Sequence, residues 1–189
     1  MSQRKILVDT NVYFRLAQSI HPLLKEEFGA EQYCLYVVKE LQQEFNKNPR
    51  LRNKYPWVNK PEYAENRSCR LQISRKEGKE IGEVFEFIFD HARTTYPGVS
   101  RVDVTILAHA YVLGVPVATD DGDMLSLAQD FDITTFRNLD LLKLMLDCDH
   151  IDIPKVREIV TYLTYVNDKP REYRRDYKKL FGEDPPISC

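Results

Sequence analysis

The stretch Lys5-Ile6-Leu7-Val8-Asp9-Thr10-Asn11-Val12 decides the fold of this chain of 189 residues. An apolar run bounded by polar residues predicts a short buried strand, which Asp9 ends. The spacing of Val12, Phe14 and Leu16 then predicts a helix over residues 11–17. A buried strand followed at once by a helix is typical of a parallel sheet, because parallel strands need a crossover connection.

The same change from an apolar run to an acidic residue and a helix recurs along the chain. Glu40 follows the apolar segment 34–38, and Asp121 follows the apolar segment 115–119. Asp103 stands at the head of an apolar helix that Ser100 is expected to cap. A last strand is expected at residues 133–136. The alternation predicts an α/β fold, a three-layer sandwich around a central, mostly parallel sheet.

The four acidic residues predict one site, because the carboxyl ends of parallel strands border a common crevice. Asp9, Glu40, Asp103 and Asp121 are therefore expected to lie together. Carboxylates in one place raise one another's pKa unless a cation neutralises them. The histidines and cysteines show no ligand spacing, and oxygen ligands alone favour Mg²⁺ or Mn²⁺. The pattern predicts a metal-dependent enzyme that acts on a phosphate ester.

Composition restricts the class of protein. The length favours one domain, and 43% hydrophobic with 30% charged residues is typical of a globular protein in water. The longest apolar runs are strand-sized, so no transmembrane helix is expected, and the N-terminus shows no apolar signal region. The four scattered cysteines are expected to be free thiols of a reducing compartment. We therefore expect a cytoplasmic protein without a membrane partner.

The net charge of −2 conceals two basic segments. Between Asn46 and Glu80 ten cations face four acidic residues, which gives +6. Between Lys169 and Lys179 six cations face two acidic residues, which gives +4 and leaves −12 for the rest of the chain. Such a distribution suits a nuclease with an acidic, metal-binding body and basic arms for a polyanion, although solvated helix faces produce the same pattern.

The chain is expected to divide into a nuclease-like domain at 1–147, with a basic insertion at 46–80, and a helical extension at 148–189. The extension either packs on the same domain or serves it as an arm. Within the first part we expect a helix from His21 to Phe28 and a proline-rich loop from Pro49 to Pro61.

The extension is expected to contain two helices. Pro154 is placed to begin the first, and Pro170 precedes the second, which is basic and ends at Phe181. Tyr173 and Tyr177 lie four residues apart in the second helix. They either stack on nucleobases or dock the helix on the core.

At four places, in the family's order, the sequence resembles the PIN-domain family of metal-dependent nucleases. The matching segments are Ile6-Leu7-Val8-Asp9-Thr10-Asn11-Val12, Glu40-Leu41, Asp103-Val104-Thr105-Ile106-Leu107-Ala108 and Val117-Ala118-Thr119-Asp120-Asp121-Gly122-Asp123-Met124. Arg15-Leu16 continues the first segment as in the VapC-type toxins of toxin–antitoxin pairs. The resemblance covers roughly residues 4–137. The stretch between the second and third segments is longer than in compact members of the family.

The resemblance implies an endoribonuclease that hydrolyses RNA with water activated by Mg²⁺ or Mn²⁺ and leaves 5′-phosphate and 3′-hydroxyl ends. It implies that Asp9, Glu40, Asp103 and Asp121 are the catalytic metal ligands and that Asp123 is an outer ligand. It also implies an antitoxin protein as a possible partner and a possible homodimer.

Four further residues are predicted to contact the phosphate or a water at the metal: Thr10, Asn11, Arg15 and Thr119. Each role has a structural alternative. Asp9, Asn11 and Asp103 can cap helices, and Arg15 can form an internal ion pair. Glu44, one helical turn after Glu40, is interpreted as a supporting or surface residue, and Asp120 is expected to be exposed.

Two other functions remain open at this point. A nuclease of the same fold can act on DNA or on a branched structure, and a PIN-like protein can bind nucleic acid without cutting it. A phosphatase of the haloacid dehalogenase type would need Asp-x-Asp after the first strand, where Asn11 stands instead.

Overall fold

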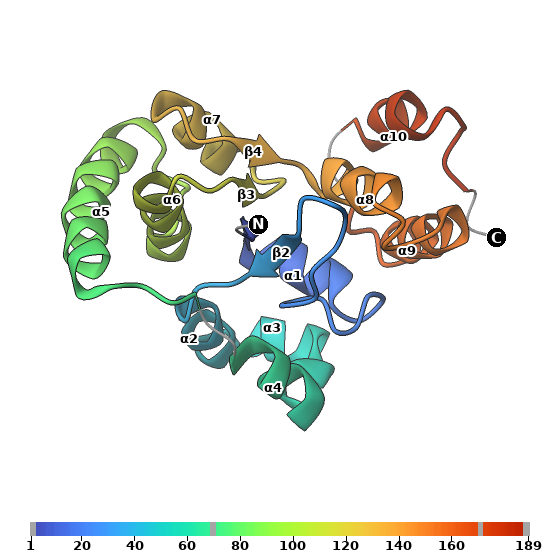
Figure 1. Cartoon of the computed structure of the whole chain (residues 1–189), viewed down its shortest axis with the longest axis horizontal. Coiled ribbons are helices and arrows are strands. Elements are labelled where there is room, and N and C mark those ends of the chain that lie inside the picture. The colour runs from blue at the N-terminus through green and yellow to red at the C-terminus, as the bar shows by residue number, and fades with distance from the viewer. Residues whose placement is uncertain (1–2, 69–70, 170–171, 187–189) are drawn as a thin grey trace.

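A parallel sheet lies at the centre of the computed structural model, which describes residues 3–68, 71–169 and 172–186 (Figure 1). In the sheet order β2-β1-β3-β4, its strands are Tyr33–Tyr36, Arg4–Val8, Val117–Ala118 and Thr135–Phe136. Each pair of neighbours is parallel, so the four carboxyl ends lie at one end of the sheet. The predicted α/β fold is confirmed: helices flank a parallel sheet on both faces.

β1 supplies the centre of both halves of the core. Ile6 and Val8 pack on one face of the sheet, with residues of α1, α8 and α9. Leu7 packs on the other face, with residues of α5, α6 and α7. Successive side chains of a strand point to opposite faces, so three consecutive apolar residues fill both cores. The two groups of helices lie on opposite sides of the sheet (Figure 1).

The helices account for most of the chain. In chain order they are α1 (Thr10–Leu16), α2 (Glu40–Lys47), α3 (Pro49–Lys54), the 3₁₀ helix η1 (Pro56–Asn59), α4 (Pro61–Ser68), α5 (Arg75–Thr95), α6 (Arg101–Leu113), α7 (Gly122–Asp130), α8 (Asn138–Asp147), α9 (Ile153–Tyr165) and α10 (Tyr173–Phe181).

The helix predicted from His21 to Phe28 is wrong, because this segment consists of bends and irregular backbone and ends in an isolated bridge between Phe28 and Tyr33. Its apolar residues still reach the core, but its backbone bonds to another part of the chain. The amide of Leu24 donates to the side chain of Asn66 (3.1 Å), whose Nδ2 donates back to the Leu24 carbonyl (2.8 Å). Lys25 has a φ of 70°, in the left-handed region, which a right-handed helix cannot contain.

The loop predicted from Pro49 to Pro61 is also wrong, because the segment contains α3 and η1. Asn48 caps α3 by accepting from the amide of Leu51, and Pro49 occupies a first-turn position where no amide is needed. Proline therefore begins helices here instead of interrupting them. Trp57 of η1 is buried and packs against Phe14 and Tyr63, so the basic insertion shares the core of α1.

The C-terminal extension also shares that core. Tyr173 and Tyr177 of α10 are buried in the cluster that includes α8 and α9, so they dock the helix and present no ring to a nucleobase. The Tyr177 hydroxyl donates to Glu183, which also pairs with Arg157 of α9. Pro170, expected to precede this helix, lies outside the described residues. Among those described, no helix is long and apolar enough to cross a membrane.

Arg67 of the insertion is buried, although it counts as one of the cations of the basic segment. It donates to the Val58 carbonyl (2.7 Å), to the Tyr13 hydroxyl (2.9 Å) and to the Gln42 side chain (2.9 Å). These bonds join α4 and η1 to α1 and α2. Arg67 therefore fixes the insertion on the domain and is not available to a polyanion.

Replacing Arg67 by Met should lower the free energy of unfolding by about 2–4 kcal/mol, because the change leaves buried acceptors without a donor. The exposed residue Arg52 of the same insertion provides the control, and Arg52→Met should stay within about 0.5 kcal/mol of wild type. Urea unfolding followed by circular dichroism measures both. Equal effects of the two substitutions would contradict the structural role of Arg67.

Candidate functional site

Asp9 is the centre of the candidate site. It ends β1, is only 2% exposed, and uses both carboxylate oxygens: Oδ1 accepts from the Val12 amide (2.6 Å) and Oδ2 from the Thr119 hydroxyl (2.5 Å). Burial raises the pKa of Asp9 from 3.8 to about 7, the two hydrogen bonds oppose this rise, and repulsion from Asp103 and Asp120 adds to it. The fold thus holds a carboxylate whose charge the protein alone does not neutralise.

Asp103 lies in the first turn of α6 and Asp121 is the N-cap of α7, and the two carboxylates are close enough to repel each other. The Ser100 amide donates to Asp103 Oδ2 (2.8 Å), and the Met124 amide donates to Asp121 Oδ1 (2.8 Å). Each cap therefore occupies one oxygen of its carboxylate. Burial is the main cause that raises the pKa of Asp103, and the negative charge of Asp121 contributes. Helix capping and metal binding are thus compatible roles for these residues.

On α2 the structure brings Glu44, and not Glu40, into contact with the Asp9 corner. The Thr10 hydroxyl donates to Glu44 Oε2 at 2.7 Å. Burial raises the pKa of Glu44, and repulsion from Asp103 raises it further. From the sequence, Glu44 was interpreted as a supporting or surface residue, and the only signal for it was its spacing of one turn from Glu40.

Glu40 lies one turn earlier, at the start of α2. Its Oε2 atom is buried and has no hydrogen-bond partner within the part of the chain that the structure describes. Its other oxygen is 3.8 Å from the amino group of Lys39. The predicted role of Glu40 as a metal ligand stays a prediction, because this unpaired oxygen is free to bind a group that the protein does not supply.

Asp123 occupies a place that a glycine leaves open. A Cβ atom added at Gly98 would meet Asp123 Oδ2 at 2.6 Å, which is closer than real contacts allow. Gly98 precedes the Ser100 cap by two residues, so the Asp123 carboxylate lies against the turn that leads to Asp103. The space that Gly98 leaves is compatible with the predicted role of Asp123 as an outer metal ligand.

The predicted phosphate contacts divide into two groups. Thr10 and Thr119 are buried and donate to carboxylates, Thr10 to Glu44 and Thr119 to Asp9, so they orient the acidic residues. The Thr119 hydroxyl also accepts from the amide of Asp121 (3.1 Å), which joins two predicted ligands through one side chain. Asn11 is exposed on α1, beside this corner.

Arg15 forms the internal ion pairs that were its structural alternative. Its guanidinium contacts Asp120 (2.7 Å) and Asp168 (2.8 Å), and its side chain is only 14% exposed. Asp168 also accepts from Lys54 and Tyr55 of the insertion.

Asp120 was expected to be exposed, but its side chain is only 6% exposed, because Arg15 and the Asn138 amide bind it. The network joins α1, the insertion, the extension and the loop that carries Asp121.

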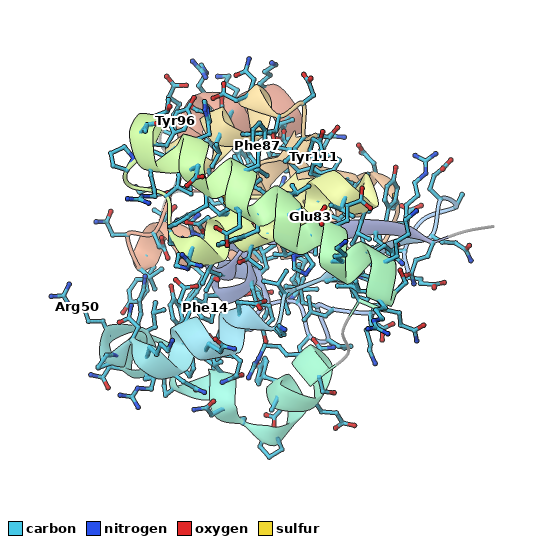
Figure 2. The ribbon with its side chains drawn as sticks, turned by 90° about the vertical axis from the view of Figure 1, so that its left-hand side faces the viewer. Phe14, Arg50, Glu83, Phe87, Tyr96 and Tyr111 are labelled. Carbon is cyan, nitrogen blue, oxygen red and sulfur yellow. The ribbon has the colours of Figure 1, made fainter. Side chains whose placement is uncertain are left out.

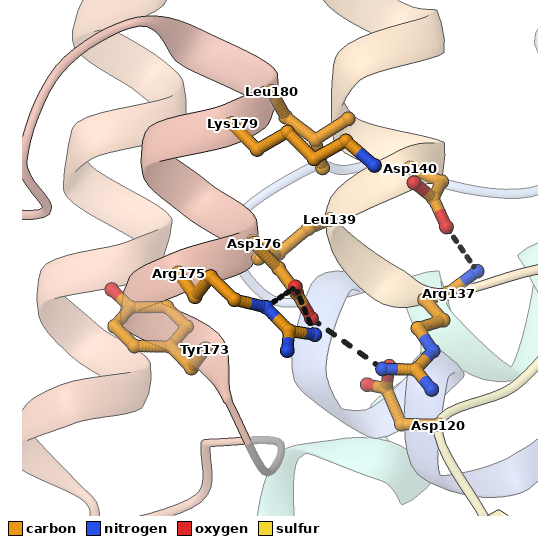
Figure 3. A pocket seen from close by; sticks show the side chains of 9 residues that line it. All are labelled: Asp120, Arg137, Leu139, Asp140, Tyr173, Arg175, Asp176, Lys179 and Leu180. Atoms are coloured by element: carbon orange, nitrogen blue, oxygen red, sulfur yellow. Dashed lines mark hydrogen bonds and ion pairs between the residues drawn. The ribbon is translucent and has the colours of Figure 1, made fainter.

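A pocket beside Asp120 shows how the extension meets this loop (Figure 3). Arg137, Arg175 and Lys179 line it together with residues of α8 and α10. The Asp176 carboxylate contacts Arg175 at 3.1 Å and Arg137 at 3.4 Å, as the dashed lines show. These ion pairs hold α10 on the domain, so Arg137 and Arg175 are already paired with a carboxylate of the protein.

The acidic residues fit a divalent cation by their chemistry. All are oxygen donors, the pKa values of Asp9, Asp103 and Glu44 are raised by burial and mutual repulsion, and Glu40 has an unpaired buried oxygen. Among the described residues, no three acidic, histidine or cysteine side chains form a ready-made ligand cluster. Side chains that repel one another are expected to separate until a cation draws them together.

Comparisons with known proteins give little further information. No family model matches the chain, and no curated protein sequence matches it significantly. Among solved structures, the crystal structure of FitAcB from Neisseria gonorrhoeae is similar: it is 18% identical, it covers 71% of this chain and 98% of its own, and the TM-score is 0.46. At this level the likeness supplies no function, which must come from the side chains described above.

The raised pKa of Asp9 predicts a pH dependence of stability in EDTA. The folded state keeps a proton on Asp9 up to about pH 7, whereas the unfolded chain releases it near pH 3.8. Stability is therefore lost as the pH rises between these values. Asp9→Asn removes this loss, so at pH 8 it should be more stable than wild type by on the order of 2–4 kcal/mol, and at pH 4 the difference should nearly vanish.

Thermal unfolding between pH 4 and pH 8 measures this difference. Asp149→Asn is the matched control, because Asp149 is exposed and has a φ of 55°, which asparagine tolerates. This control should follow the wild-type profile. An Asp9→Asn profile parallel to wild type would show that the Asp9 carboxyl titrates in its usual range.

Proposed function

We propose that this chain is a metal-dependent nuclease that hydrolyses RNA phosphodiester bonds. The observation that carries the proposal is the buried Asp9 carboxylate, which no cation contacts among the described residues and which Asp103 and Asp120 repel. Asp103 is in turn repelled by Asp121 and interacts with Glu44, so the acidic residues form one electrostatically connected group. A buried charge is expected only where a partner compensates it. Oxygen donors alone point to Mg²⁺ or Mn²⁺ as that partner.

Each acidic side chain has its own role in the proposed metal site. Asp9, Asp103, Asp121 and one glutamate of α2 would hold the ion, and Asp123 would act from the outside. When bound, a divalent ion supplies an activated water and a counter-charge for the leaving oxygen. Thr119 and Thr10 fix the carboxylates of Asp9 and Glu44 by hydrogen bonds, so the donor oxygens need little reorganisation.

RNA is the preferred substrate in this proposal because of the Asp-Thr-Asn and Thr-x-Asp-x-Asp segments that resemble PIN-domain ribonucleases. The same resemblance supports a role as the toxin of a toxin–antitoxin pair, with an antitoxin protein as its partner. The exposed Arg50 of the insertion points outward at the side of the molecule where α5 ends at Tyr96 (Figure 2). Such an exposed cation would attract a polyanion.

Cleavage of matched, end-labelled RNA and DNA oligonucleotides tests the proposal. Wild type should cut RNA with Mg²⁺ or Mn²⁺ and should be inactive in EDTA. Asp9→Asn, which keeps the shape of the side chain and removes its charge, should reduce the rate at least 1,000-fold, or roughly 4 kcal/mol of transition-state stabilisation. Asp149→Asn should retain the wild-type rate.

Cutting of DNA alone would move the assignment to a deoxyribonuclease of the same fold. No cutting of either polymer by folded, metal-loaded protein would favour a binding role. Metal-independent cutting would contradict the proposed chemistry.

The two glutamates of α2 can be separated by the same assay. Because Glu44 contacts Thr10 and interacts with Asp103, Glu44→Gln should lower the rate more than 100-fold, beyond the roughly 10–100-fold of a residue that only supports a ligand. Excess Mn²⁺ should partly restore this variant. Glu40→Gln should have the smaller effect, and the reverse order would show that Glu40 is the ligand, as predicted from the sequence.

A further inference from the structure

Arg101 forms a flat cationic surface two residues before Asp103. Its guanidinium carbon lies 4.9 Å from the ring centroid of Phe85 and 4.5 Å from that of Phe89. The two rings stack on each other at 5.5 Å with an interplanar angle of 14°. Phe85 and Phe89 are half-buried, whereas Arg101 is exposed. The rings thus fix one face of the guanidinium, and the arginine can offer its other face to an occupant.

Several cations lie over aromatic rings. Arg4, Lys54 and Arg67 are each bound by a carboxylate or an amide oxygen as well. Arg93 lies 6.0 Å from the centroid of Phe89 alone, whereas Arg101 lies closer, over two rings, and lines two hollows. Arg101 makes no ion pair with any residue in the described part of the chain. Apart from the two rings, its charge therefore has no partner of opposite sign there.

Two adjoining hollows meet at this arginine. One, of about 610 Å³, lies between α5, α6 and the end of β2, and the other, of about 620 Å³, lies between α2, α5 and the start of α6. They share four lining residues: Glu40, Phe85, Arg101 and Thr105. Both volumes fall within the range of roughly 300–1,000 Å³ that small-molecule sites occupy. The second hollow also includes Glu44, so it opens onto the candidate metal site.

We propose that Arg101, supported by Phe85 and Phe89, is a stacking platform for one unpaired nucleobase of the substrate. The proposal rests on the proposed nuclease function and adds a subsite to it: the bound strand would be single-stranded next to the cleaved phosphodiester, with one base turned into the hollow. The exposed Lys47 lines the same hollow and is placed for the backbone of that nucleotide.

A nucleobase fits this platform better than other occupants. Unstacked bases of single-stranded RNA stack on aromatic rings and on arginine planes, and a flat π-system matches the flat guanidinium. A bare phosphate would bind the edge of the guanidinium and would need no aromatic support. The glutamates that line the hollow also disfavour a bare anion there, whereas a base carries no charge.

Binding of labelled single-stranded oligoribonucleotides to the uncleaving Asp9→Asn protein tests this subsite. In one set of probes an abasic nucleotide replaces each position in turn. One position should be sensitive, with binding weakened about 10-fold, the effect expected for the loss of one stacked base. In a background that also carries Arg101→Lys, which keeps the charge and removes the plane, the intact probe should bind about 10-fold more weakly and the abasic change should have no further effect.

Phe85→Leu should reproduce part of this loss. Phe87→Leu is the matched control: Phe87 is on the same helix but 70% exposed on its outer side, near Tyr111 and away from the hollows (Figure 2). It should leave binding unchanged.

Three outcomes would overturn the platform while the proposed function stands: no sensitive position, a sensitivity that persists in Arg101→Lys, or equal loss for every probe. The last outcome would indicate a contact with the backbone. Unchanged oligonucleotide binding in Arg101→Lys would likewise overturn the platform. If no oligonucleotide is bound or cut at all, the proposed function fails, and this inference fails with it.

Discussion

The burial of one carboxylate, Asp9, at the end of the central strand is the constraint on which the rest of the structure depends. β1 places apolar side chains in both cores, and Asp9, which directly follows this strand, is only 2% exposed. Its two oxygens join α1, through Val12, to the end of β3, through Thr119. The fold tolerates a group whose pKa is raised to about 7 because the packing around it over-determines its position. Strain of this kind is expected at functional sites.

Three of the residues proposed as metal ligands also cap helices. In an open parallel sheet, the residue after a strand is close to the residue that begins the next helix, so one position serves both purposes. Asp9 and Asp121 each accept from an amide of a first helical turn, and Asp103 accepts from the amide of the N-cap residue Ser100. Each bond uses one carboxylate oxygen and restricts the rotamer of the side chain. A residue that looks like an ordinary cap in the sequence can therefore be part of the site.

Much of the fold was predictable because short apolar runs, each followed by an acidic residue and a helix, mark its strands. The apolar runs that end at Asp9, Glu40 and Asp121 gave the order of strands and helices, although β3 and β4 are only two residues long. The helix expected at His21 to Phe28 failed because its apolar residues serve tertiary packing and its backbone bonds to Asn66. Local periodicity cannot reveal such a bond.

Part of the candidate site was likewise predictable from local patterns, and part was not. Asp9, Asp103 and Asp121 follow from strand ends and helix starts, whereas the choice between Glu40 and Glu44 depends on how α2 rotates when Leu41 and Phe45 are buried. Contacts between residues far apart in the chain left no local signal. The pairing of Arg15 with a carboxylate 153 residues away, and the position of Arg101 over two rings of another helix, are of this kind.

The most direct test of the central claim is a calorimetric titration of Mn²⁺ into wild type and Asp9→Asn in buffers of different ionisation enthalpy. If Asp9 is protonated when the site is empty and is a ligand when it is filled, Mn²⁺ binding at pH 6 should release about one proton, and binding at pH 8.5 should release almost none. Asp9→Asn should show neither the tight binding nor the proton release. Saturable binding that is identical in the two proteins, or no binding by wild type, would contradict the account.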